Sequence, residues 1–329
     1  MGFAEDLVSG PRGRRLCFAA VAGPHLPTTF GIDAARIADF FDELGDGDVD
    51  FLASWEESAF LDPLAESVDR ARYWQEPDEV DRALALPDVR RALVPTARAI
   101  ASAPAVQRWF EPIDLGRQFH AEFAHTGPPG TGRAAKALAD WRTSTVEDER
   151  RARNRPADPA APFSGFWWSS PTGEVVDSTC APHGMGPLGL CLVEDDFGPE
   201  EAWCRSVRPT GAPRIFEITG PAAWSELAGR YPLEVSLSRR HDWWKVTGRA
   251  GRWVIPDWTA VAADYDAVHL TVAGYLTGAG RALPVGEACS VLAGWNPGQT
   301  FWLTDVIVVG PAVRWHGDAA DLTTWTPAR

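Results

Sequence analysis

The spacing of apolar residues along the chain changes from helical to strand-like about half-way. In the segment IDAARIADFFDEL, the apolar residues Ile37, Phe40, Phe41 and Leu44 recur at helical spacing. Asp33 is a suitable N-cap for this helix. Prolines scattered through residues 56–110 predict several short helices there rather than one long rod.

A further helix is predicted over residues 134–153, where it ends in a charged run. The segment RPADPAAPF at residues 155–163 is rich in proline and alanine, which is typical of a linker. We therefore expect a mainly helical N-terminal domain over residues 1–155 and a second domain over residues 163–329.

The second half carries short aromatic or β-branched runs bounded by Gly, Pro or Asp, and these predict strands. The runs are FSGFWWSS, LGLCLVE, RIFEI, RWVIP, AVHLTVAGYL and FWLTDVIVV. PAAWSELAGRY and DWTAVAADY read as short helices between them, the first opened by Pro221 and the second capped by Asp257. Near the N-terminus, LCFAAVAG is expected to be a first strand. The predicted fold class is α+β, with the strand-rich, Trp-rich part built from two small packed sheets.

Composition narrows the function classes. The net charge of −14 disfavours a nonspecific nucleic-acid binder, which needs a basic face. No run is long and apolar enough to predict a membrane span. Five scattered cysteines do not resemble a disulfide framework, which favours a cytoplasmic protein. Only two lysines accompany many arginines, as in GC-rich bacterial coding, so arginine abundance carries little functional weight.

Twelve of the sixteen tryptophans lie in the second half. Most are expected to fill the core, but some can wall a pocket for a flat or sugar-like ligand. Trp167 and Trp168 are adjacent, and neighbouring side chains of a strand point to opposite faces. One of the two is therefore expected to face a cleft or another element.

Two segments carry candidate binding chemistry. SRRHDWWK gathers Arg239, Arg240, His241 and Trp243, and guanidinium groups beside indoles suit a nucleotide. A solvated loop whose arginines pair with acids is the equal alternative. In PDWTAVAADYDAVHLT, Asp266 precedes a strand carrying His269, and an aspartate close to a histidine can orient its imidazole.

Other motifs are less specific. GPPGTGR resembles a phosphate-binding loop but has Arg133 where that loop needs lysine, so a turn before a helix is favoured. His120, Glu122 and His125 lack the HExxH spacing, and Cys180 with His183 forms a lone CxxH, so no metal is expected. The acidic run of residues 194–196 could supply paired carboxylates.

The order of these segments resembles ADP-ribosyltransferase-like domains, which consume NAD. FWWSSP, with Ser169 and Ser170, resembles the family's aromatic-Ser-x-Ser strand, and AVHLTV resembles its later strand. GWNPGQTFWL resembles the closing strands, so the likeness spans residues 163–309. The family's glutamate is replaced in that later strand by His269 or Thr271.

The resemblance implies NAD as substrate, with loss of nicotinamide by ADP-ribosyl transfer to an unknown acceptor or by glycohydrolysis. The cofactor-binding residues it implies are Trp167, Trp168, Ser170, Arg239, Arg240, His241 and Trp243. The catalytic residues it implies are Ser169, Asp266 and His269. For the family's first-strand Arg or His, the candidates are Arg117 and His120.

Two other functions stay open. One is a different enzyme acting on a sugar or nucleoside, using tryptophan platforms and carboxylates from residues 194–196 or from Asp264 and Asp266. The other is a non-enzymatic binding or immunity-type protein whose acidic surface meets a basic partner.

Overall fold

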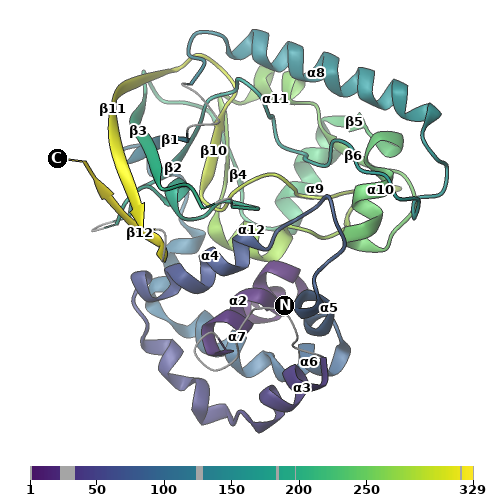
Figure 1. Cartoon of the computed structure of the whole chain (residues 1–329). Helices are drawn as coiled ribbons and strands as arrows, with labels where there is room; N and C mark the ends of the chain where they lie inside the picture. The colour runs from purple at the N-terminus through teal and green to yellow at the C-terminus, as the bar shows by residue number, and fades with distance from the viewer. Residues whose placement is uncertain are drawn as a thin grey trace.

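The computed structural model describes residues 2–22, 34–123, 129–182, 185–196, 198–318 and 321–328. Helices dominate the first part of the chain, and a large sheet with further helices forms the rest, as expected for an α+β fold (Figure 1). Within the described residues, no helix combines the length and apolar character that crossing a membrane requires.

The N-terminal part is a layer of short helices. Its α-helices are α1 (Phe3–Ser9), α2 (Pro11–Ala22), α3 (Ala34–Glu43), α4 (Leu61–Asp69), α5 (Glu79–Leu84), α6 (Pro87–Ala92) and α7 (Val94–Ser102). Its 3-10 turns are η1 (Asp46–Ser54), η2 (Glu57–Phe60) and η3 (Pro104–Phe110). The several short helices expected over residues 56–110 are confirmed. The expected strand at residues 16–23 is wrong, because its described residues lie inside α2 and are buried between neighbouring helices.

Eight strands form one sheet in the order β12-β11-β3-β1-β2-β10-β7-β4. Neighbours are antiparallel except β4 and β7, which run parallel. The strands are β1 (Gln118–Phe123), β2 (Asp177–Cys180), β3 (Glu201–Pro209), β4 (Ile215–Ile218), β7 (Ala267–Leu270), β10 (Gln299–Trp302), β11 (Ile307–Asp318) and β12 (Asp321–Pro327). Two pairs stand apart, β5 (Pro232–Glu234) with β6 (Val254–Pro256), and β8 (Leu283–Val285) with β9 (Ala288–Ser290). One large sheet thus replaces the two small packed sheets expected.

Five α-helices lie in the later part of the described chain. They are α8 (Ala134–Arg151), α9 (Pro221–Arg230), α10 (Ser236–Thr247), α11 (Trp258–Asp264) and α12 (Val272–Gly278), with the 3-10 turns η4 (Ala152–Asn154) and η5 (Leu188–Leu190). Asp257 caps α11 by accepting from the backbone N–H of Thr259 at 3.2 Å, as predicted. Residues 238–245 lie inside the helix α10, so the alternative that they form a solvated loop is wrong.

Two further strand predictions fail. Residues 163–169 form no strand, and LGLCLVE contains only the turn η5. AVHLTVAGYL divides into β7 and α12, because Thr271 caps a helix by accepting from the backbone N–H of Gly274 at 2.9 Å.

The larger of two hydrophobic clusters among the described residues joins the helical layer to the sheet. Its members include Leu16 and Phe18 of α2 and Leu276 of α12. Figure 1 shows α4 and α12 where the two parts meet. β1 comes before the boundary at residue 155 yet lies inside the sheet, between β2 and β3. The division into domains 1–155 and 163–329 stays a prediction.

Candidate functional site: an arginine-lined cleft

A cleft of about 1080 Å³ opens between the helical layer, the C-terminal end of α10 and the chain that follows α12. Its charged lining consists of seven arginines and four carboxylates. The arginines are Arg12, Arg14, Arg70, Arg72, Arg82, Arg90 and Arg281, and the carboxylates are Glu76, Asp78, Glu79 and Asp81. A net excess of three cations on one cleft is unexpected in a chain of net charge −14. Such a lining attracts anions.

α2 brings two of these arginines to the cleft. Gly13 lies between them, and a Cβ there would meet the backbone oxygen of Leu7 at 2.3 Å. Only glycine therefore allows α1 and α2 to pack this closely. The close packing fixes Arg12 and Arg14 beside the C-terminal end of α1.

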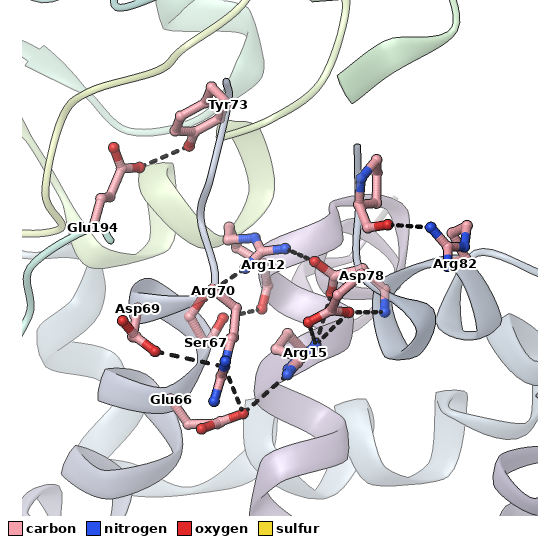
Figure 2. Close-up of polar contacts among 12 residues, drawn as sticks. Arg12, Arg15, Glu66, Ser67, Asp69, Arg70, Tyr73, Asp78, Arg82 and Glu194 are labelled. Atoms are coloured by element: carbon pink, nitrogen blue, oxygen red, sulfur yellow. Dashed lines mark hydrogen bonds and ion pairs between the residues drawn. The ribbon is translucent and has the colours of Figure 1, made fainter. Parts of the chain in front are cut away.

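Arg12 belongs to a buried ion-pair network. Its guanidinium bonds Asp81 and donates to the backbone oxygen of Ser67 at 2.7 Å. Arg15 pairs with Asp78 at 3.0 Å and with Glu66 at 3.1 Å (Figure 2). Burial opposes the charge on Arg12, but Asp81, Tyr275 and Tyr73 together outweigh burial and raise the pKa of Arg12. These two arginines are held by carboxylates and serve the fold.

Arg14 is buried without such a partner. Within the described part of the chain, its side chain donates only to the backbone oxygens of Val8 and Ser9, at 3.2 and 3.1 Å. No carboxylate among the described residues forms an ion pair with it, although the residue is only 8% exposed. Burial, together with repulsion from Arg90, lowers the pKa of Arg14 to about 10. A buried guanidinium that has no carboxylate partner is stabilised when an anion approaches it.

Three more arginines of the cleft lack carboxylate partners within the described part of the chain. Arg281 donates to the backbone oxygen of Thr277 at 2.8 Å, and burial and Arg90 act together to lower its pKa. Arg82 donates to the backbone oxygen of Pro77 at 2.7 Å. Arg14, Arg90 and Arg281 are close enough for Arg90 and Arg281 to depress the pKa of Arg14. These three residues are called the cationic cluster below.

The segment that follows α4 forms another wall of the cleft and is fastened to residues 194–196. Arg72 pairs with Asp195 at 2.9 Å. The hydroxyl of Tyr73 donates to Glu194 at 2.7 Å (Figure 2). Asp195 has φ of 51°, which is rare for a residue other than glycine. Burial raises the pKa of Glu194 to about 7. A carboxyl that titrates near neutral pH therefore lies directly behind Tyr73, a lining residue of the cleft.

Some of the predicted site residues do meet, but inside the core. Ser169 is fully buried, and its hydroxyl donates to the backbone oxygen of Ala293 at 3.1 Å. Arg239 donates to the backbone oxygen of Trp168 at 3.3 Å, and the indole of Trp243 donates to that of Trp167 at 2.7 Å. These contacts tie residues 163–170 to α10 and to the strand-rich part.

Four other predicted residues have separate surroundings. The hydroxyl of Ser170 bonds the backbone oxygen of Gly294, and Arg240 donates to the backbone oxygen of Ala152 at 2.9 Å. His241 is buried against the ring of Phe163. Asp266 pairs with Arg214 at 3.1 Å, and this contact lowers the pKa of Asp266 to about 2.

His269 lies in β7, between Glu217 of β4 and Thr300 of β10. Its Nδ1 is 2.8 Å from the hydroxyl of Thr300, and its Nε2 is 4.0 Å from the carboxylate of Glu217. Burial lowers the pKa of His269 to about 3, so the imidazole is neutral at physiological pH. None of the ten predicted site residues lines the cleft.

The metal-capable residues noted in the sequence are only partly placed. His120 of β1 holds Asp177 through Nδ1 at 2.7 Å, whereas His125 and His183 lie outside the described residues. Among the residues that are described, no group of three or more His, Cys, Asp or Glu side chains is arranged to hold a metal ion.

Comparison with family models, with curated proteins and with solved structures found no match for the chain. The cleft must therefore be interpreted from its own geometry and charge.

Proposed function

We propose that this protein binds a phosphate-bearing small molecule in the arginine-lined cleft. The observation that carries the proposal is Arg14, a buried guanidinium that forms no ion pair with a described carboxylate and that lines the same cleft as Arg90 and Arg281. Guanidinium groups bind phosphate through charge-assisted, often paired hydrogen bonds. A phosphate among the three cations would relieve their mutual repulsion.

The placement of the cluster supports the same proposal. Arg14 belongs to α2, Arg90 to α6, and Arg281 to the turn after α12. Three segments that are distant in sequence thus bring like charges together at one cleft. Without a ligand this arrangement costs stability, because Arg14 is buried and the half-buried Arg281 and the exposed Arg90 carry the same charge beside it. A bound anion gives the arrangement a physical reason.

The proposal is tested by calorimetric titration of the whole chain with inorganic phosphate, at constant ionic strength set with chloride. We expect saturable binding that Arg281→Gln weakens at least tenfold, because a charge-assisted hydrogen bond contributes about 1.5–3 kcal/mol. The matched control is Arg208→Gln, at an exposed position of β3, which should leave binding unchanged. Equal weakening by both variants, or heat no larger than with chloride, would exclude the cleft as an anion site.

NAD-dependent ADP-ribosyl transfer or glycohydrolysis, expected from the resemblance, stays a separate prediction. Nicotinamide release from NAD by the purified chain tests it, with Ser169→Ala and His269→Ala as variants. Release that survives in both variants would count against the roles that the resemblance gives to those residues.

A further inference from the structure

We infer that the ligand is a diphosphate ester, in which the diphosphate is joined to a hydroxyl-rich organic group such as a nucleoside or a sugar. This inference rests on the proposed function and specifies its ligand. It follows from the charge of the cationic cluster, the size of the cleft and the free polar groups on another part of its lining.

The charge of the cluster exceeds what one phosphate neutralises. Arg14, Arg90 and Arg281 supply three cations to one cleft. Among the described residues no carboxylate forms an ion pair with any of them, although Asp81 attracts Arg14 and Asp6 attracts Arg281 at longer range. A monophosphate ester carries about −1.5 to −2 near pH 7. A terminal diphosphate adds a further charge and further acceptor oxygens, so it matches three guanidinium groups more closely.

The cleft is larger than the anion alone needs. Its volume of about 1080 Å³ lies slightly above the range, about 300–1,000 Å³, that is typical of pockets for whole organic ligands. A diphosphate at the cationic cluster would leave most of this space free. The ligand should therefore carry a substantial organic part.

The remaining lining suits hydroxyl groups. Gln75 and Glu76 both line the cleft, and neither makes a side-chain hydrogen bond or ion pair with another described residue. An amide both donates and accepts, and a carboxylate accepts, so together they can bind neighbouring hydroxyls of a sugar. Val80 and Val246 provide apolar surface on the same cleft.

The test compares four compounds on the wild-type chain at fixed pH and ionic strength: AMP, ADP, inorganic pyrophosphate and ribose 5-diphosphate. AMP is the matched control for ADP, because it differs by one phosphate. We expect at least one of the two diphosphate esters to bind about tenfold more tightly than AMP, and also more tightly than pyrophosphate. ADP and ribose 5-diphosphate differ only in the base, so the tighter of the two distinguishes a nucleoside from a simple sugar.

A variant locates the organic part. Gln75→Ala should lower the affinity for the better ester by several-fold more than the affinity for pyrophosphate. Equal affinities for AMP and ADP, or for pyrophosphate and both esters, would overturn the inference while phosphate binding itself still stood. If no phosphate compound bound, the proposed function would fail as well.

Discussion

Replacing Arg14 with methionine should stabilise the protein when no anion is present. Burial and neighbouring arginines lower the pKa of Arg14 from 12.5 to about 10. A depression of this size corresponds to about 3 kcal/mol of destabilisation of the charged form. Methionine removes that cost but also removes the bonds to the oxygens of Val8 and Ser9, which contribute about 1 kcal/mol each. The net expectation is a gain of about 1 kcal/mol in the free energy of unfolding.

Phosphate should reverse this order. A ligand that binds only the folded state stabilises it by about 2.7 kcal/mol at one hundred times its dissociation constant. The wild type should gain this stability, and Arg14→Met should lose most of it. Urea denaturation in chloride and in phosphate at equal ionic strength measures both effects. Arg98→Met, at an exposed position of α7, is the control.

The reasoning would be refuted if Arg14→Met were less stable than wild type in chloride and responded to phosphate as the wild type does. That result would mean that the guanidinium is already neutralised in the free protein. Its place in the cleft would then be structural.

Two further changes test the surroundings of the cleft. Glu194 has a pKa of about 7 in the folded state, against an ordinary value of 4.5. Between pH 4.5 and pH 7 the carboxyl is therefore protonated in the folded chain and ionised in the unfolded chain. The free energy of unfolding should fall by up to about 3 kcal/mol as pH rises from 4.5 to 7 and beyond. Urea denaturation measures this pH profile. Glu194→Gln should flatten that part of the profile, whereas the exposed control Glu226→Gln should leave it unchanged. Asp81→Asn leaves Arg12 buried without its carboxylate and should lower the free energy of unfolding by about 3–5 kcal/mol. A loss below 1 kcal/mol would show that Asp81 does not hold Arg12 in solution.

The sequence predicted those elements whose ends carry local signals. α9 and α11 were recognisable from Pro221 and Asp257, because proline at a helix start and aspartate at an N-cap act through their own backbone neighbourhood. α2 was not recognisable from the sequence, because a short apolar run such as LCFAAVAG fits a buried helix as well as a strand. β1 was missed because His120 and Glu122 interrupt its apolar pattern, although its place in the sheet buries His120.

The cleft could not be predicted from local sequence. Its cationic cluster comes from three segments that only the tertiary structure brings together, and the coding bias makes single arginines uninformative. The available signal was GPRGRRL, where Gly13 separates the arginines of α2. Ser169, Arg239 and Trp243, to which the resemblance gives roles at an NAD site, donate hydrogen bonds to backbone oxygens and do not line the cleft.

The most direct test of the central claim is modification of arginines by phenylglyoxal, mapped by peptide mass spectrometry with and without phosphate at equal ionic strength. The account predicts that phosphate protects Arg90 and Arg281 of the cleft. Arg98 and Arg208, which are exposed elsewhere on the protein, should react at the same rate in both conditions. Equal protection of all four arginines, or of none, would contradict an anion site in this cleft.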